Sequence, residues 1–168
     1  MGEVVGGTVF GPTPDTVIIR KMTTSDIVRI GELERECFTT PWTEEAFYNE
    51  LVHNHFANYL VMVWRDTIIG YAGLWTILDE AHVTNIAIGA AYRGRKLGER
   101  LLTDLMSLAI ARGMKRITLE VRVSNTIAQR LYEKFGFYPE GVRQRYYSDN
   151  HEDAIIMWAD LPVYDEEG

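Results

Sequence analysis

Residues 97–112 carry the most restrictive pattern in the chain. Apolar residues recur at i, i+4, i+8 and i+12 as Leu97, Leu101, Leu105 and Ala109, which is the period of an amphipathic helix. Gly113 ends the pattern, and residues 117–123 then alternate apolar and polar side chains as a strand does. A second extended segment, 82–88, precedes the helix. A helix between two strands buries its apolar stripe on a sheet, so these residues predict an α/β protein.

The rest of the chain extends this unit into one domain. Further periodicity predicts strands at 16–22, 59–64, 68–78, 137–147 and 153–159, and helices at 24–37, 43–51 and 125–135. Thr24 or Ser25 is the expected cap of the first helix, and a hairpin turn is expected at 148–151. We therefore predict a single-domain, mixed and mostly antiparallel sheet with helices on both faces. Residues 1–15 are expected to be a flexible extension, 16–162 the domain, and 163–168 an acidic tail.

Composition narrows the classes of function. The net charge of −7 argues against a nucleic-acid partner and suits a cationic substrate. Cys37 is the single cysteine, and the four histidines are scattered, so neither a disulfide nor a zinc site is expected. The chain lacks the roughly 18 apolar residues of a membrane span, and its start lacks the pattern of a signal peptide. We expect a cytoplasmic protein without a membrane partner.

The turn between the strand at 82–88 and the helix at 97–112 has the features of an anion site. A strand–turn–helix junction directs unpaired backbone N–H groups and the positive end of the helix dipole at one point. Arg93, Arg95 and Lys96 add positive charge there. A pyrophosphate suits such a site. Taken alone, the run is equally compatible with a basic helix start after a flexible turn.

Here the sequence resembles the GCN5-related N-acetyltransferase (GNAT) family, whose pyrophosphate loop reads Q/R-x-x-G-x-G/A. Arg93 takes the first position of that motif and Gly98 the last. Lys96 replaces a preferred glycine, and because it opens a good helix we expect helical backbone there. Five further runs resemble the bacterial ribosomal-protein-alanine N-acetyltransferases, the RimI group, within that family: 85–88, 119–125, 131–137, 145–147 and 152–157. The segment Pro41-Trp42-Thr43 also fits this group.

The resemblance implies acetyl-coenzyme A (acetyl-CoA) as cosubstrate, without a metal ion. It implies that the backbone at 86–88 pairs with the pantetheine arm as an added strand would. For Asn125, capping of the following helix and contact with the cofactor are both compatible with its position. The residues expected to contact the cofactor are Ile86, Ala87, Ile88, Arg93, Gly94, Arg95, Lys96, Leu97, Gly98, Glu99 and Asn125.

Acetyl transfer to an amine needs a neutral amine, stabilisation of an oxyanion and a proton for the departing thiolate. Strand alternation places Glu120 opposite Leu119 and Val121. The pattern alone allows an ordinary solvent-facing glutamate, whereas the resemblance implies a catalytic base. Tyr132 lies on the apolar face of its helix, where a core aromatic is the simplest interpretation; the resemblance implies that its hydroxyl protonates the sulfur. Tyr146 and Tyr147 are compatible with cross-strand packing or with walls of an acceptor groove.

The acceptor implied by the resemblance is the N-terminal alanine of a small-subunit ribosomal protein. An α-amine is neutral in roughly one molecule in seven at pH 7, against roughly one in 2,500 for a lysine. An N-terminal acceptor therefore demands less of the base. Two alternatives stay open: a lysine or small-amine acetyltransferase of the same fold, and a non-catalytic acetyl-CoA-binding subunit. The second has no need of both Glu120 and Tyr132.

Overall fold

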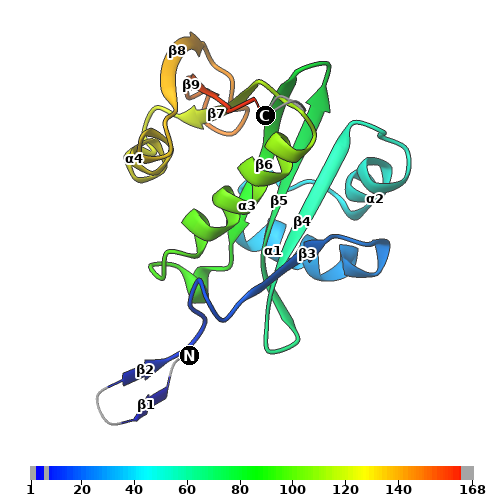
Figure 1. Ribbon diagram of the computed structural model, residues 1–168, viewed down its shortest axis with the longest axis vertical. Coiled ribbons are helices and arrows are strands. Elements are labelled where there is room, and N and C mark those ends of the chain that lie inside the picture. Colours follow the sequence, from blue (N-terminus) through cyan, green and yellow to red (C-terminus); the bar gives the residue numbers. More distant parts are fainter. Residues whose placement is uncertain (1–2, 6–7, 164–168) are drawn as a thin grey trace.

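The computed structural model describes residues 3–5 and 8–163, with side chains from Phe10 onward. A seven-stranded sheet with the order β3-β4-β5-β6-β7-β9-β8 forms the body of the protein (Figure 1). Every neighbouring pair is antiparallel except β6 and β7. The strands are β3 (Ile18–Lys21), β4 (Ala57–Trp64), β5 (Thr67–Ile77), β6 (Glu80–Ile88), β7 (Arg116–Arg122), β8 (Tyr138–Arg143) and β9 (Ala154–Asp160). The predicted mixed, mostly antiparallel sheet is confirmed.

Helices cover both faces of this sheet, as predicted. On one face lie α1 (Ile27–Cys37) and α2 (Glu44–Val52), and on the other α3 (Leu97–Ala111) and α4 (Thr126–Lys134) (Figure 1). A short 3-10 turn, η1 (Thr24–Asp26), precedes α1, and its cap is Thr23 rather than Thr24 or Ser25. The side chain of Asp26 accepts the Thr23 N–H, which moves the start of the element back by one residue.

Each face has its own hydrophobic core. The apolar stripe of α3 is fully buried at Leu101, Leu102 and Leu105, which pack in one cluster with the inner side chains of β5, β6 and β7. The second core, beneath α1 and α2, is built around Phe47 and Tyr71, whose rings meet edge to face at 5.9 Å. The two cores hold the sheet between them and fix the strands that carry the site.

The sheet divides between β6 and β7. Their parallel pairing covers Glu80–His82 against Arg116–Thr118 and ends there. Directly afterwards β6 has a bulge at Thr84, because Leu74 of β5 pairs with Val83 and its neighbour Gly73 pairs with Asn85. A bulge inserts an extra residue and increases the local twist of its strand. The two strands therefore diverge beyond His82, and among the described residues no strand pairs with this edge of β6 along 83–88.

The predicted strand at 137–147 is too long, but the predicted turn at 148–151 is present. The N–H of His151 donates to the carbonyl of Tyr147 at 2.9 Å, and the N–H of Tyr147 donates to the carbonyl of Glu152 at 3.2 Å. Strand β8 ends at Arg143, and residues 144–153 form a loop before β9. Arg145 adopts left-handed backbone with φ 52°, and the guanidinium of Arg122 lies 3.9 Å from the centre of the Tyr147 ring. The left-handed turn at Arg145 and this contact take Tyr146 and Tyr147 out of the strand. Because Arg122 belongs to β7, the contact cannot be read from the local alternation of residues 137–147.

The N-terminal segment contains regular structure that the sequence analysis did not predict. The backbone forms a two-stranded antiparallel sheet from β1 (Glu3–Val5) and β2 (Thr8–Phe10). Pro12 is buried, and the Arg100 guanidinium of α3 donates to the carbonyl of Pro14. Most of the proposed acidic tail, residues 164–168, lies outside the described residues. No helix in the described part of the chain is long and apolar enough to cross a membrane.

Candidate active site

Two clefts meet where β6 and β7 diverge. Each has a volume of about 580 Å³. One is bounded by β6, the turn before α3, and α4; we call it the cofactor cleft. The other, the acceptor cleft, is bounded by β6, β7, the connection between α1 and α2, and the loop 144–153. Ile86, Asn125 and Tyr132 line both. A ligand in one cleft can therefore reach a ligand in the other at these three residues.

The cofactor cleft contains nearly all of the predicted cofactor contacts. Its lining includes Ile86, Ala87, Ile88, Arg93, Gly94, Lys96, Leu97, Gly98, Glu99 and Asn125. Along 86–88 the β7 side of β6 pairs with no strand of the described chain, so the backbone N–H and C=O groups at this edge suit an extended ligand that contains amides. The geometry fits the pantetheine arm of acetyl-CoA by the same rule that pairs strands.

Of the two arginines of the turn, Arg93 lines the cofactor cleft and Arg95 does not. The Arg93 guanidinium donates to the carbonyl of Ile88 at 3.1 Å and contacts Cys37 Sγ at 3.4 Å, so it braces the turn against β6 and α1. Arg95 does not line the cleft; its guanidinium lies against Gly11, where an added Cβ would come within 2.5 Å of it.

Two basic residues of the cofactor cleft were missed by the sequence analysis. Arg130 and Lys134 of α4 line it, and Lys134 Nζ lies 2.8 Å from Glu99 Oε1 of α3. Their i, i+4 spacing on one helix face was a signal for a shared surface. The positive charge that an anionic ligand meets therefore comes partly from α4.

The prediction of helical backbone at Lys96 is wrong. Lys96 has φ 61° and ψ 21°, the left-handed conformation, and it forms the N-cap of α3. This conformation turns the chain sharply into the helix. The first N–H groups of α3 have no partner within the helix, and this start of α3 lines the cofactor cleft. A left-handed L-residue costs about 1–2 kcal/mol relative to right-handed backbone. The preference of the family for glycine at this position has the same physical origin.

We expect Lys96→Gly to be more stable than Lys96→Ala by about 0.5–1 kcal/mol. Both variants lose the same charge, but only glycine adopts φ 61° without strain. The greater freedom of glycine in the unfolded chain offsets part of the gain. Urea unfolding of the two variants measures the difference. Equal stability, or a more stable alanine variant, would show that the left-handed turn at this position is not strained.

Glu120 lies in the acceptor cleft, with a side chain that is only 9% exposed. Its Oε2 is 2.7 Å from Nε2 of His82, and its Oε1 is 3.6 Å from Nε of Arg143. Alternation had correctly placed it on the face away from the Leu119 core. That face borders the cleft between the diverging strands, so Glu120 is not the solvent-facing glutamate that the pattern also allowed.

Tyr132 and Asn125 stand at the junction of the clefts. Tyr132 packs against Phe137 with ring centres 5.7 Å apart, and burial raises the pKa of its hydroxyl to about 12. It is thus a packed aromatic whose side chain also borders both clefts. The Asn125 side chain accepts the backbone N–H of Ala128 at 3.1 Å and caps α4. Capping and contact with both clefts coexist in this one residue.

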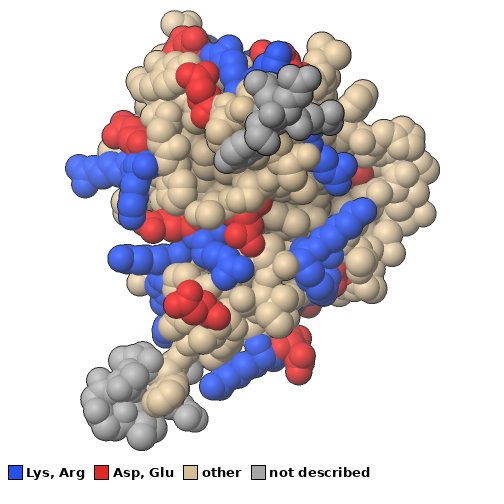
Figure 2. Space-filling view, in the orientation of Figure 1, with Lys and Arg blue, Asp and Glu red and all other residues tan. Residues whose placement is uncertain are grey.

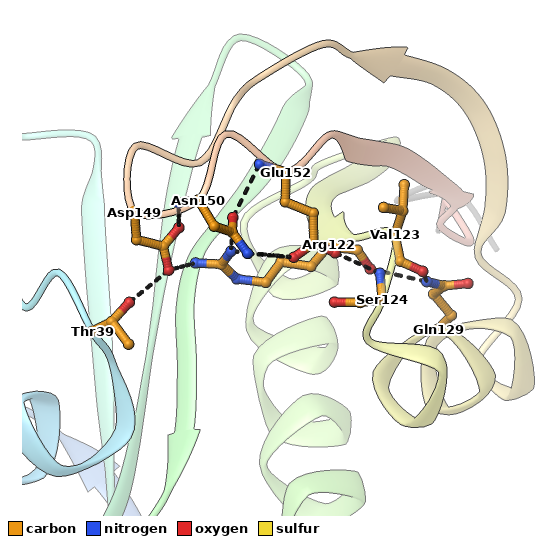
Figure 3. A network of polar contacts seen from close by, with 8 residues as sticks. All are labelled: Thr39, Arg122, Val123, Ser124, Gln129, Asp149, Asn150 and Glu152. Carbon is orange, nitrogen blue, oxygen red and sulfur yellow. Dashed lines mark hydrogen bonds and ion pairs between the residues drawn. The ribbon is translucent and has the colours of Figure 1, made fainter.

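A polar network joins the acceptor cleft to the start of α4 (Figure 3). Arg122 forms ion pairs with Asp149 at 2.9 Å and with Glu152 at 3.4 Å, both in the segment before β9. Glu152 also accepts the N–H of Ser124 at 2.7 Å, and the Thr39 hydroxyl donates to Asp149 at 2.7 Å. These contacts place Tyr146 and Tyr147 along the acceptor cleft, as the groove interpretation required.

A buried carboxyl group in the acceptor cleft was also missed. Glu34 of α1 accepts hydrogen bonds from the Tyr71 hydroxyl and, at 3.3 Å, from the backbone N–H of Trp42. Burial raises the pKa of Glu34 to about 7. Its place four residues after Ile30 on the buried face of α1 was the available signal. Glu34 fixes the α1–α2 connection that walls the cleft.

The distribution of charged side chains and of potential metal ligands bears on what the two clefts can bind. Among the described residues, no group of three or more histidine, cysteine, aspartate or glutamate side chains could hold a metal ion. Figure 2 shows acidic and basic side chains interspersed over one face of the described part of the molecule, without a broad basic surface. The lining of the acceptor cleft contains the carboxyl groups of Glu34, Glu120 and Asp149 and one guanidinium, that of Arg122. The hydrogen bond from Thr39 and the neighbouring Arg122 lower the pKa of Asp149 to about 2, so it stays charged at neutral pH.

Comparison with known proteins identifies the family. Residues 27–137 match the family model described as "Acetyltransferase (GNAT) family". A Bacillus subtilis (strain 168) protein, named as a candidate [ribosomal protein bS18]-alanine N-acetyltransferase, is 47% identical over 143 residues, which are 85% of this chain and 95% of the relative. A Haemophilus ducreyi protein named for the same activity is 36% identical over 145 residues, covering 83% and 97%.

Comparison with a solved structure supports the same family. The crystal structure of the ribosomal-protein-S18-alanine N-acetyltransferase from Escherichia coli superposes with a TM-score of 0.82 at 30% identity, over 90% of this chain and 98% of that chain. The division of the sheet between β6 and β7 and the turn that leads into α3 are consistent with these matches. The chain therefore belongs to the GNAT family of acetyltransferases.

Proposed function

We propose that this protein transfers the acetyl group of acetyl-CoA to the N-terminal α-amine of a protein, namely the N-terminal alanine of a small-subunit ribosomal protein. One observation carries the proposal. Glu120 lies in the acceptor cleft, Tyr132 lies where that cleft meets the cofactor cleft, and the two are held on consecutive elements, β7 and α4. The pair thus stands on the two sides of the place where amine and thioester meet.

The chemistry follows from these positions. Glu120 takes a proton from the acceptor ammonium, directly or through one water, and the neutral amine attacks the thioester carbonyl. Backbone N–H groups along the free edge of β6 at 86–88 stabilise the developing oxyanion. Tyr132 donates a proton to the departing sulfur and regains one from the nitrogen as the tetrahedral adduct collapses to the amide. The net reaction converts an ammonium and a thioester into an amide, a thiol and one proton that leaves for solvent.

The acceptor is argued from charge and from the relatives. Among the residues that line the acceptor cleft, Arg122 pairs with Asp149, and the carboxyl groups of Glu34 and Glu120 remain. This excess of carboxyl groups favours a cationic chain terminus. An α-amine is the amine that this base deprotonates most readily, since its pKa lies near 8 rather than above 10. The relatives from Haemophilus ducreyi and Escherichia coli are named for alanine N-acetylation of a ribosomal protein. An acceptor of that kind places the reaction in the cytoplasm.

We expect a peptide with a free N-terminal alanine followed by basic residues to be acetylated at its α-amine. The same peptide with a blocked N-terminus and an internal lysine should react at least 10-fold more slowly, because far less of its amine is neutral at pH 7. Mass spectrometry after incubation with acetyl-CoA locates and quantifies the acetyl group. Faster reaction at the lysine would reject the N-terminal assignment, and a lack of reaction at any amine would favour a non-catalytic acetyl-CoA-binding subunit.

A further inference from the structure

His82 is a titratable residue at the site that the mechanism above does not use. It occupies the last paired position of β6, opposite Thr118 of β7, where the two strands begin to diverge. Its Nε2 lies 2.7 Å from Oε2 of Glu120, a residue 38 positions away in the sequence. A single hydrogen bond thus joins the proposed base to an imidazole on the neighbouring strand.

The imidazole is held in place from its other side. The Trp75 ring of β5 meets His82 edge to face, with centres 5.9 Å apart, and the Trp75 indole N–H lies 3.2 Å from both carboxylate oxygens of Glu50. Glu50 is itself buried. This chain from Glu50 through Trp75 fixes the orientation of His82, and His82 fixes one oxygen of Glu120.

The exposed fractions of the two side chains differ. The Glu120 side chain is 9% exposed and that of His82 is 33% exposed. Each turnover leaves one proton that must reach solvent, and Glu120 is poorly placed to deliver it. The other basic group within 4.0 Å of this carboxylate, among the described residues, is the Arg143 guanidinium. A guanidinium stays protonated and cannot accept a proton, whereas an imidazole gains and loses one near neutral pH.

We propose that His82 relays to solvent the proton that Glu120 takes from the acceptor amine. The amine N–H bond breaks as an O–H bond forms on Glu120; that bond then breaks as Nε2–H forms on the imidazole. Water then takes the Nδ1 proton from the exposed edge of the imidazolium, which leaves the Nε2–H tautomer. Exchange of that Nε2 proton with solvent, with return of a proton to Nδ1, frees Nε2 for the next turnover. His82 acts through Glu120, so it is a positioning and relay residue, and this role rests on the proposed function.

Two substitutions separate positioning from proton relay. His82→Gln keeps a side-chain N–H for Glu120 but cannot accept a proton, and His82→Ala opens a space beside Glu120. We expect kcat to fall by about 10-fold to 10²-fold in both, with CoA affinity unchanged. Free imidazole in the buffer should restore the rate of His82→Ala in proportion to its concentration. His55→Ala, which removes an exposed histidine after α2, should match the wild type with and without imidazole.

The relay is overturned if His82→Gln keeps the wild-type kcat, or if imidazole does not accelerate His82→Ala. Protection of each variant against heat by CoA shows that it is folded and binds the cofactor. If the alanine variant does not fold, kcat of His82→Gln decides. In the double variant His82→Ala with Glu120→Gln, imidazole should have no effect. If the wild type acetylates no α-amine, the proposed function fails. If Glu120→Gln keeps full activity, Glu120 is not the base and the relay fails with it; if Glu120→Gln is inactive while His82→Gln is normal, the relay alone fails.

Discussion

Glu120→Gln lowers kcat by about 10²-fold to 10⁴-fold, while acetyl-CoA still binds with wild-type affinity. Glutamine has nearly the same shape and can still pair with His82, which lies 2.7 Å away, but it cannot take a proton from the acceptor. The side chain lines the acceptor cleft and not the cofactor cleft, so cofactor binding has no reason to change. Steady-state kinetics and calorimetric titration with CoA measure the two effects separately.

The lost rate of Glu120→Gln should return in part as the pH rises. At higher pH more of the acceptor amine is already neutral, and the base is needed less. Glu133→Gln, which makes the same charge change at an exposed position of α4, should keep the wild-type rate at each pH. A Glu120→Gln variant with a near wild-type rate at pH 7 would reduce this carboxylate to a structural partner of His82.

Tyr132→Phe lowers kcat by about 10²-fold or more through loss of the proton for the departing thiolate. The ring stays packed against Phe137, so the fold should be nearly as stable as that of the wild type. Burial raises the pKa of this hydroxyl to about 12, so it stays protonated through the usual assay range and can serve as an acid. Enzyme assays from pH 6 to 9, with urea unfolding as the check on stability, test this.

In contrast to Glu120→Gln, the tyrosine variant should not recover at high pH, because the proton of the amine is not what it lacks. Tyr138→Phe, a hydroxyl deletion at an exposed position of β8, is the matched control and should be fully active. Recovery of Tyr132→Phe with rising pH, equal to that of Glu120→Gln, would show that the two residues do not divide the work as proposed.

Local periodicity predicted the main elements and part of the site. The stripe of α3 and the alternation of β7 are set by side chains a few residues apart, so they can be found without knowledge of the rest of the chain. Alternation likewise put Glu120 on the face away from the core. Resemblance to the family suggested the proposed roles of Glu120 and Tyr132, because no local pattern distinguishes these residues from a surface glutamate and a core aromatic.

What only the tertiary structure decided depends on residues that are far apart in the sequence. The bulge at Thr84 and the short pairing of β6 with β7 open the clefts and bring His82 within 2.7 Å of Glu120. The ion pairs of Arg122 with the loop 144–153 end β8 early, against the alternation that continued to Tyr147. The left-handed backbone of Lys96 is set by the path from β6 into α3. Sequence periodicity reports which face of an element is buried, whereas packing between distant elements determines what that face meets.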